Sequence, residues 1–571
     1  MKILGVRYGH DASAALIIDG KIIADVAEER FSRIKNDTSF PIKAIEYCLE
    51  EGKISSEELD ILAISSDNFP PIFKVFFEFP ETVLQKIEPK GINKLKKRIE
   101  VFLKGGSFLP VLPLYQKPFR LSEKCNIYLC EHHLAHAASA YYTSGLKNEK
   151  VLIATMDGRG DLVSNAIWIG ENNKISLLKK WDGESSIGWF YANVTEALMW
   201  RQSSDEWKVM GLAPYGKRQK GLFDGFHPVF KDGELVKAHN YGSFGRWTDH
   251  GANHYHGSDS NALHKIAQTI NAEDFAAEAQ EVVEEQMFNL ILPWLEKTGI
   301  KHLCCAGGCF LNVKFNQNLW YRNVLETQWV YPNPGDSGLA VGAALSAHFN
   351  YFPDAGHVLL QHTYYGPEFS NETIKEILDS RLINSKYYEN IEAETAKHLS
   401  ENKVVAWFQG RMEAGPRALG NRSILMSPLK AENKDIINAK VKYREKFRPF
   451  CPSVHYDKAK NYLENSRDEL FMVTSFNARD EKKHLIPAVV HKDGTSRPQM
   501  VKKEVNERYY NLIDEFGKIT GEYIILNTSF NIKGEPIVSN PREAIKCFYD
   551  TGIDVLVLGN YLIEKEISSK Y

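Results

Sequence analysis

Short apolar runs separated by polar turns open the chain. Residues 2–6 and 12–18 are apolar, and Asp19-Gly20 is a two-residue hairpin signal before a further run over residues 21–27. The pattern therefore predicts three strands at the N-terminus. The turn between the first two strands contains Gly9, and a glycine turn lets backbone N–H groups hold a phosphate or a substrate hydroxyl.

Three charged residues outside regular elements each have two interpretations. Asp11 closes the first turn and is a candidate general base, whereas a local cap is the alternative, because aspartate favours turns. Lys35 ends a charged stretch that either faces an anionic ligand or forms a solvated surface. Lys208 lies in a polar-to-glycine stretch and either meets a phosphate or carbonyl oxygen or is an ordinary exposed lysine.

A helical pattern begins at Glu131, directly after an apolar strand pattern over residues 127–130, and contains two histidines. His132 and His136 are four residues apart, so a helix places both imidazoles on one face. Imidazole nitrogen binds Fe, Zn, Ni or Mn, and one or two carboxylates complete an open site. The alternative is polar capping and packing, because this spacing is common by chance.

Two aspartates follow buried strand patterns. The apolar run over residues 151–156 ends at Asp157 in a glycine-rich turn, which is where α/β sheets place ligand chemistry. Asp336 opens a helix of small and apolar residues over 337–349. It either caps that helix or ligates a metal across a cleft from the histidine pair.

A second glycine turn, Gly307-Gly308, follows a strand pattern over residues 302–306 and precedes Asn312. Such a turn lets adenosine or phosphate lie against the backbone. The nearby cysteines 304, 305 and 309 do not have a zinc spacing, and we interpret them as small buried residues.

The C-terminal part carries cations in glycine-bounded turns. Residues 350–369 are rich in proline and glycine and read as a linker, so we place a domain boundary after residue 355. Arginine and lysine in such turns favour a phosphate pocket over the alternative of surface charges. The cations of these turns include Arg411, Arg417, Arg422, Lys442, Arg448 and Arg497.

Length and composition narrow the class of protein. The 571 residues are too many for one core, so two or three domains are expected. A net charge of −3 argues against a nucleic-acid partner. We expect no membrane span, no signal peptide and no disulfide scaffold from the eight cysteines, and therefore a cytoplasmic location.

Eight motifs, in order along the chain, resemble those of the NodU/CmcH family of O-carbamoyltransferases. They are GHDAS (residues 9–13), HHLAH (132–136), DG (157–158), KVMGLA (208–213), GG with LN (307–308 and 311–312), GPRALG (415–420), REKFRP (444–449) and LNTSFN (526–531). Residues 217–262 and 68–120 lack a matching motif, and the latter include a basic amphipathic helix predicted over residues 91–104.

The resemblance implies an α/β protein of two domains. Residues 1–355 would be an actin/sugar-kinase-like ATPase (ASKHA) domain that transfers the carbamoyl group, and residues 356–571 a YrdC-like α/β domain. In the family reaction, carbamoyl phosphate and ATP give carbamoyl-adenylate and pyrophosphate, with a phosphate leaving. The carbamoyl group then passes to an acceptor hydroxyl and AMP leaves.

The resemblance also assigns roles to individual residues. His132, His136, Asp157 and Asp336 resemble ligands of a divalent metal, ferrous iron in related structures. Asp11 resembles the base that deprotonates the acceptor, with His10 and Lys208 as further catalytic candidates. The expected nucleotide contacts are Lys35, Asp157, Gly158, Arg159, Gly160, Asp161, Gly307, Gly308 and Asn312. The expected carbamoyl phosphate contacts are Arg417, Lys442, Arg448, Arg497, Asn527 and Ser529.

The expected partners are carbamoyl phosphate, ATP, accompanied or not by Mg²⁺, and a hydroxylated small molecule such as a sugar or natural product. No nucleic acid or membrane is expected, and a homodimer stays open. Two other functions compete with this one. The first is tRNA threonylcarbamoyladenosine-type modification, in which both folds occur. The second is a non-catalytic ATP-binding scaffold, which leaves the cation-rich turns unexplained.

Overall fold

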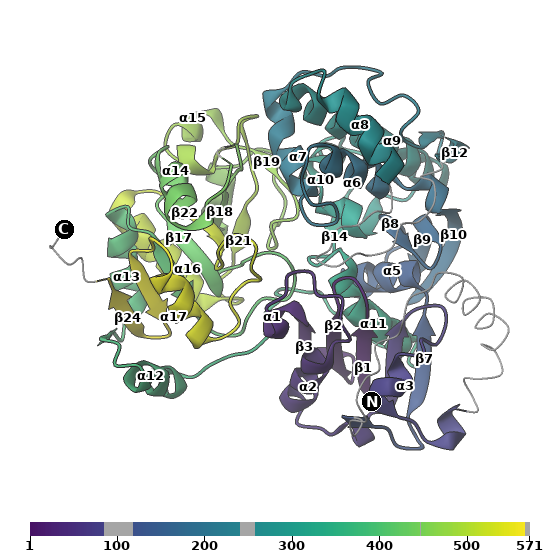
Figure 1. Ribbon diagram of the computed structural model, residues 1–571, viewed down its shortest axis with the longest axis horizontal. Coiled ribbons are helices and arrows are strands. Elements are labelled where there is room, and N and C mark those ends of the chain that lie inside the picture. The colour runs from purple at the N-terminus through teal and green to yellow at the C-terminus, as the bar shows by residue number, and fades with distance from the viewer. Residues whose placement is uncertain (85–117, 240–256, 446, 566–571) are drawn as a thin grey trace.

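The computed structural model describes residues 1–84, 118–239, 257–445 and 447–565 and shows a mixed α/β protein (Figure 1). The amphipathic helix predicted over residues 91–104 lies outside these ranges. All eight cysteines are free thiols, which confirms that the chain is not a disulfide scaffold.

The first sheet contains the three predicted N-terminal strands. β1 (Lys2–Arg7), β2 (Ser13–Ile18) and β3 (Lys21–Ala27) form an antiparallel meander. β4 (Ile61–Ser65) and β7 (Asn126–Cys130) continue the sheet parallel to β1, in the order β3-β2-β1-β4-β7. The carboxyl ends of β1, β4 and β7 therefore share one edge.

The second sheet repeats this arrangement. β8 (Val151–Gly160), β9 (Val163–Glu171) and β10 (Lys174–Asp182) form the meander. β13 (His302–Ala306) and β14 (Thr327–Val330) run parallel to β8, in the order β10-β9-β8-β13-β14. Asp157 and Gly307 thus lie at one edge of this sheet, as the strand patterns predict.

Two helices each cover one of these sheets and pack on each other. α11 (Leu339–Tyr351) packs on β1 and on α5 (His132–Tyr142), and α5 packs on β8 and β13. A Cβ on Gly342 would lie 1.9 Å from the carbonyl oxygen of Ala135, so the two helices meet this closely because residue 342 is glycine. The small residues predicted after Asp336 therefore serve close helix packing.

Further elements complete the N-terminal half. The helices are α1 (Glu29–Ser32), α2 (Ile42–Glu51), α3 (Phe73–Phe76), α6 (Ile187–Ala197), α7 (Glu206–Leu212), α8 (Gly257–Ala267), α9 (Ala272–Thr298) and α10 (Val313–Trp320). Two small two-stranded sheets pair β5 (Phe77–Glu78) with β6 (Phe119–Arg120) and β11 (Val229–Lys231) with β12 (Glu234–Lys237).

An eight-stranded mixed sheet forms the C-terminal half. Its order is β15-β24-β23-β16-β17-β22-β18-β21. The strands are β15 (Lys386–Tyr387), β16 (Val405–Phe408), β17 (Arg422–Met426), β18 (Cys451–His455), β21 (Gln499–Val501), β22 (Ile524–Ser529), β23 (Val555–Leu558) and β24 (Tyr561–Glu564). The short strands β19 (Phe476–Asn477) and β20 (Thr495–Ser496) pair separately.

Both faces of this sheet are buried. Val405 and Trp407 of β16 belong to the core under α13 (Ile391–Ser400) and α16 (Glu507–Thr520), whereas Ala406 and Phe408 belong to the opposite core. This alternation is the period of a strand, and it explains the continuous apolar run. The remaining helices are α12 (Asn371–Ser380), α14 (Asn433–Ile437), α15 (Asp480–Lys483) and α17 (Pro541–Tyr549).

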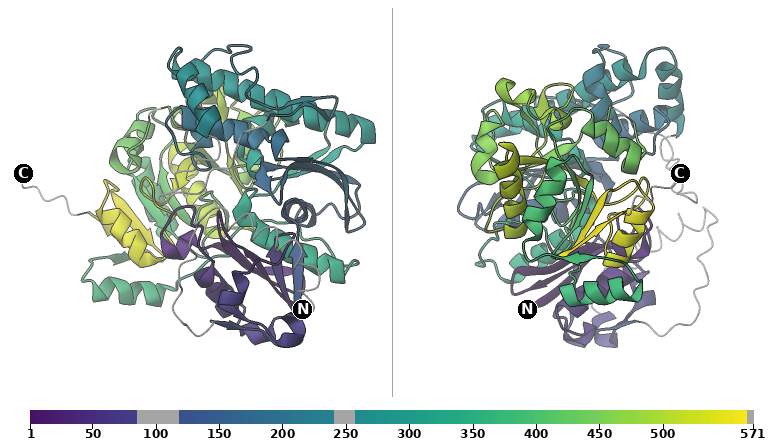
Figure 2. Two further views of the ribbon diagram at one scale, coloured as in Figure 1. Left: turned by 45° about the vertical axis from the view of Figure 1, so that its right-hand side comes forward. Right: turned by 90° about the vertical axis from the view of Figure 1, so that its left-hand side faces the viewer.

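The two halves touch through arginine side chains. Arg33 donates to the carbonyl oxygens of Pro536 and Ile537, each at 2.7 Å, and Arg411 donates to that of Ile23 at 3.0 Å. In the right-hand view of Figure 2 the C-terminal half, green to yellow, faces the viewer and overlaps the N-terminal half. The predicted boundary after residue 355 falls between α11 and α12, in a segment without helix.

Asp25 gives the fold a pH dependence. Its side chain in β3 is 4% exposed, and burial raises the pKa of its carboxyl to about 7 from an ordinary 3.8. In the unfolded chain the Asp25 carboxyl ionises above about pH 4, whereas in the folded chain it stays protonated up to about pH 7. The free energy of unfolding therefore falls as the pH rises through this interval and levels off above it. The full loss is roughly 4 kcal/mol.

We expect Asp25→Asn to remove this loss. The melting temperature of the variant, relative to that of the unaltered protein, should therefore be higher at pH 8 than at pH 5. Asp232→Asn, at an exposed aspartate, is the control. A difference that does not change with pH would show that Asp25 ionises normally in the folded chain.

Candidate metal centre and anion pocket

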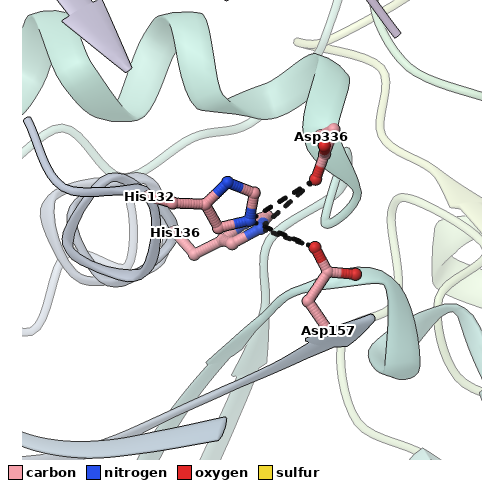
Figure 3. A group of neighbouring side chains, drawn as sticks. All are labelled: His132, His136, Asp157 and Asp336. Carbon is pink, nitrogen blue, oxygen red and sulfur yellow. Dashed lines mark hydrogen bonds and ion pairs between the residues drawn. The ribbon is translucent and has the colours of Figure 1, made fainter. Parts of the chain in front are cut away.

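Four side chains that the sequence places far apart converge in the N-terminal half. His132 and His136 come from α5, Asp157 from β8, and Asp336 from the turn that leads into α11 (Figure 3). One ligand atom from each lies within 4.8 Å of the others. The Nε2 atoms of His132 and His136 lie 3.2 and 3.4 Å from Oδ2 of Asp157.

Glycines next to this group make its packing possible. A Cβ on Gly160 would lie 2.0 Å from the ring of His132, and one on Gly308 would lie 2.8 Å from Oδ1 of Asp157. The Gly308 N–H donates to that same oxygen at 3.2 Å. Whatever their contacts with a nucleotide, Gly160 and Gly308 thus make room for His132 and orient Asp157.

The surroundings hold the four residues in place. Asp161 accepts from the backbone N–H of His132 at 3.0 Å, and Arg7 donates to Oδ2 of Asp336 at 2.5 Å. His133 faces elsewhere, because its two ring nitrogens lie 3.0 Å from the Thr155 hydroxyl and 3.0 Å from the Val163 carbonyl. Only two of the three helix histidines therefore point into the group.

The donor set fits a divalent metal. Two imidazole nitrogens and two carboxylates suit Fe²⁺, Zn²⁺ or Mn²⁺. Among the described residues, Nε2 of His136 is buried without a hydrogen-bond partner of normal geometry. Burial alone would lower the pKa of His136, but Asp157 and Asp336 outweigh burial and raise it. The carboxylates thus attract positive charge to this point, and a metal ion would supply it.

The candidate base lies in the turn after β1. Asp11 adopts a left-handed φ of 54°, and its carboxylate accepts from Asn36 at 2.8 Å and lies 3.2 Å from Nδ1 of His10. Burial would lower the pKa of His10, but attraction from Asp11 and Asp336 raises it to about 9. Despite its burial, the pKa of Asp11 is lowered by His10, so its carboxyl is ionised. An ionised carboxylate near the four-residue group has the chemistry of a base.

The residues predicted for a nucleotide do not all gather at the glycine turn. Gly307 has a φ of 103°, and a Cβ there would lie 2.1 Å from the carbonyl oxygen of Met156. Asn312 caps α10 and exchanges hydrogen bonds with Gln280 at 3.0 and 3.1 Å. The guanidinium of Arg159 lies 5.7 Å from the Trp189 ring. Their contacts with a nucleotide stay predictions.

Lys35 belongs to different surroundings. Burial lowers the pKa of its ammonium, and the charges that act on it are those of Glu29, Asp205, Arg448 and Arg201. Lys35 therefore lies near the cations of the C-terminal half, where it adds positive charge. Its predicted contact with a nucleotide requires the nucleotide to reach this point.

Cations gather in the C-terminal half around Lys442. Its ammonium donates to the carbonyl oxygen of Ser529 at 2.5 Å and to two oxygens of Asn531 at 2.8 and 2.9 Å. Burial and Arg444 hold the pKa of Lys442 well below its ordinary range. Burial lowers the pKa of Arg417 to about 9, with a further contribution from Arg497, and that of Arg448 to about 10. So many buried cations favour an anionic ligand.

Three residues in and around this pocket received no individual role from the sequence. Arg444 and Asn531 lie in the motifs over residues 444–449 and 526–531, close to Lys442 and Ser529, so these motifs are the signal that could have found them. Glu413 organises the loop that carries Arg417, because its Oε1 accepts from the N–H groups of Leu419, Asn421 and Arg422 at 2.7, 2.8 and 3.1 Å. No local pattern marks Glu413 for this role.

Other predicted members have defined partners. Asn527 donates to the Ser453 hydroxyl at 2.9 Å, and Arg497 lies 3.0 Å from the sulfur of Cys451. Arg422 is structural rather than ligand-binding, because it donates to the carbonyls of Gln409, Gly410 and Pro367. Arg411, which joins the two halves, is structural in the same way.

Lys208 is buried and lies between the halves of the chain. Its ammonium is 2.9 Å from Asp205 and 3.7 Å from Glu445 of the C-terminal half. These contacts direct it toward the anion pocket. The catalytic role predicted for Lys208 stays a prediction.

Comparisons with known proteins cover nearly the whole chain. Family models described as Carbamoyltransferase N-terminus and Carbamoyltransferase C-terminus match residues 2–345 and 396–565. An uncharacterized protein of Synechocystis sp. is 33% identical over 99% of this chain and 96% of its own length. Nodulation protein NolNO of Sinorhizobium fredii is 34% identical over 98% of this chain and 80% of its own length.

The comparison with solved structures is weaker. Full-length HypF in the phosphate- and nucleotide-bound form aligns with a TM-score of 0.33 and 12% identity, over 62% of this chain and 56% of that one. Likeness at this level supports no functional inference. No helix in the described part of the chain is long and apolar enough to cross a membrane. The two family models match the chain in the same order as the motifs and together span most of it. The chain therefore belongs to the NodU/CmcH carbamoyltransferase family and is a carbamoyl-transferring enzyme.

Proposed function

We propose that this chain is an ATP-dependent O-carbamoyltransferase that works in two steps. Water first cleaves carbamoyl phosphate to carbamate and phosphate. A carbamate oxygen then attacks the α-phosphorus of ATP and expels pyrophosphate, which leaves carbamoyl-adenylate. In the second step a hydroxyl of a sugar or natural product attacks the carbamoyl carbon, its proton goes to a base, and AMP leaves.

The observation that carries this proposal is the buried cation cluster around Lys442. Arg417, Arg444 and Arg448 all have pKa values lowered by burial, and the loop around Glu413 holds Arg417 in place. A phosphate carries up to about two negative charges at pH 7 and three acceptor oxygens. A cluster of this kind is suited to carbamoyl phosphate, and Ser529 and Asn527 would add neutral donors.

The second step is assigned to the N-terminal half. Asp11, ionised and held by Asn36, would accept the proton of the acceptor hydroxyl. His132, His136, Asp157 and Asp336 would hold a divalent metal, ferrous iron by family resemblance, and the metal would polarise a carbonyl oxygen. The reactive mixed anhydride would be protected from water within the chain.

We also propose the finer fold assignment. The repeated strand order of the two N-terminal sheets supports an ASKHA-type domain, since that superfold consists of two related lobes around a nucleotide cleft. The cation pocket on the eight-stranded mixed sheet supports a YrdC-like domain. ATP is the expected co-substrate, bound with or without Mg²⁺.

The test is the release of AMP and pyrophosphate from ATP with and without carbamoyl phosphate. We expect release to require carbamoyl phosphate and to fall at least roughly 100-fold in Arg448→Ala, because one fixed cation of the anion pocket is removed. Arg322→Ala is the control, because Arg448 and Arg322 each lie over an aromatic ring, that of Trp207 at 3.5 Å and that of Phe288 at 4.2 Å, but Arg322 belongs to the N-terminal half.

Other outcomes would favour the competing functions. ATP turnover that ignores carbamoyl phosphate would contradict the proposal and favour an ATP-binding scaffold. AMP release that requires threonine and bicarbonate, together with tRNA binding, would identify tRNA modification.

A further inference from the structure

Arg448 lies against a tryptophan of the other half of the chain. Its guanidinium carbon is 3.5 Å from the centre of the Trp207 ring, well inside the roughly 6 Å range of a cation–π contact. The indole N–H of Trp207 donates to the carbonyl oxygen of Ser204 at 2.9 Å, which fixes the ring. Trp207 belongs to α7, which lies at the side of the N-terminal half that faces the C-terminal sheet (Figure 1).

Among the described residues, few other contacts fix the Arg448 side chain. One terminal nitrogen lies 3.3 Å from Glu445, and only 12% of the side chain is exposed. Within the described ranges, its buried Nε has no hydrogen-bond partner. A guanidinium has five N–H donors, so this one keeps donors for a ligand while the indole face supports its plane.

The rest of α7 and the residues before it hold the chain around Arg448. The ring of Trp200 lies 6.0 Å from that of Phe447, and Lys208 lies 3.7 Å from Glu445. A Cβ on Gly211 would lie 3.4 Å from Pro449, so this glycine allows α7 to approach. The N-terminal half therefore forms one wall of the cation pocket.

We propose that Trp207 is a positioning residue for Arg448, so that the N-terminal half completes the anion pocket of the C-terminal half. This inference rests on the proposed function, because it names Arg448 as a carbamoyl phosphate contact. It adds that the first step requires the two halves to be docked. Without the indole, Arg448 keeps its charge but loses the surface that orients it.

The experiment compares Trp207→Leu, Trp207→Phe and the unaltered protein in carbamoyl-phosphate-dependent pyrophosphate release. We expect Trp207→Leu to raise the KM for carbamoyl phosphate roughly tenfold and to leave the KM for ATP unchanged. Trp207→Phe keeps an aromatic ring, so its KM for carbamoyl phosphate should be close to that of the unaltered protein. In an Arg448→Lys background, Trp207→Leu should add little, because the planar guanidinium is already gone.

Trp294→Leu is the matched control. Trp294 is also half-buried, donates to a backbone carbonyl, that of Gly233 at 3.0 Å, and carries a cation, Lys297 at 5.0 Å. It lies on α9, away from the pocket, so its variant should keep both KM values. Melting temperatures of all variants show whether a kinetic change reflects lost folding.

Each other result overturns the positioning role. An unchanged KM for carbamoyl phosphate would exclude it, and a KM that rises for ATP alone would mean that the indole contacts the nucleotide. If the unaltered protein releases no pyrophosphate, the proposed function fails, and the Kd of inorganic phosphate by calorimetry then decides. Trp207→Leu should raise this Kd, and Trp207→Phe should bring it back close to the value of the unaltered protein. Equal Kd values for all three proteins, or no binding of phosphate to any of them, would refute the inference.

Discussion

His136→Ala is expected to lose bound divalent metal and to slow carbamoyl transfer about 1000-fold. The imidazole would supply one of four candidate ligand atoms, which lie within 4.8 Å of one another. Its removal leaves two carboxylates that repel each other and only one histidine beside them. Loss of metal polarisation removes several kcal/mol of transition-state stabilisation. The metal content is measured by mass spectrometry, and transfer by incorporation of labelled carbamoyl into a panel of hydroxylated sugars.

His133→Gln is the matched control for this prediction. His133 lies on the same helix and is equally buried, but it contacts Thr155 and Val163 instead of the carboxylates. Its variant should keep the metal even if it unfolds at a lower temperature. Should His136→Ala fail to fold, Asp336→Asn tests the same site from another element. Normal metal content in both variants would show that these residues do not bind the metal.

Asp11→Asn is expected to slow carbamoyl transfer by about 10²- to 10⁴-fold and to leave pyrophosphate release intact. The carboxylate is ionised and held by Asn36 at 2.8 Å, and an amide cannot accept a proton in its place. In the proposed first step, pyrophosphate release depends on the pocket around Lys442, which this change does not touch. Parallel assays of pyrophosphate and of labelled product separate the two steps.

Asp19→Asn provides the comparison for Asp11. Asp19 is also an aspartate in a turn with positive φ, 50° against 54° for Asp11, but it lies at the exposed hairpin of β2 and β3. Its variant should transfer carbamoyl groups normally. Equal loss of both steps in Asp11→Asn would indicate a structural turn, which is the capping interpretation of this residue.

Local features were within reach of the sequence. The three N-terminal strands follow from apolar runs and the Asp19-Gly20 turn, because hairpin geometry is set by neighbouring residues. His132 and His136 share a helix face because the helical repeat alone places residues four apart together. Strand ends at Asp157 and Gly307 were equally predictable, since both follow buried runs.

Contacts between distant segments were decided by the tertiary structure. Asp157 and Asp336 meet the histidines only because the carboxyl ends of β8 and β14 lie at the same edge of the second sheet and because α11 packs on α5. Arg417 and Arg422 occupy similar glycine-rich surroundings in the sequence, yet the carbonyls of Gln409 and Pro367 bind Arg422.

The same holds for the contact between Arg448 and Trp207, which depends on docking of the two halves. A periodic pattern records which face of an element is buried, but not which element covers it. That choice depends on packing and desolvation across the whole chain.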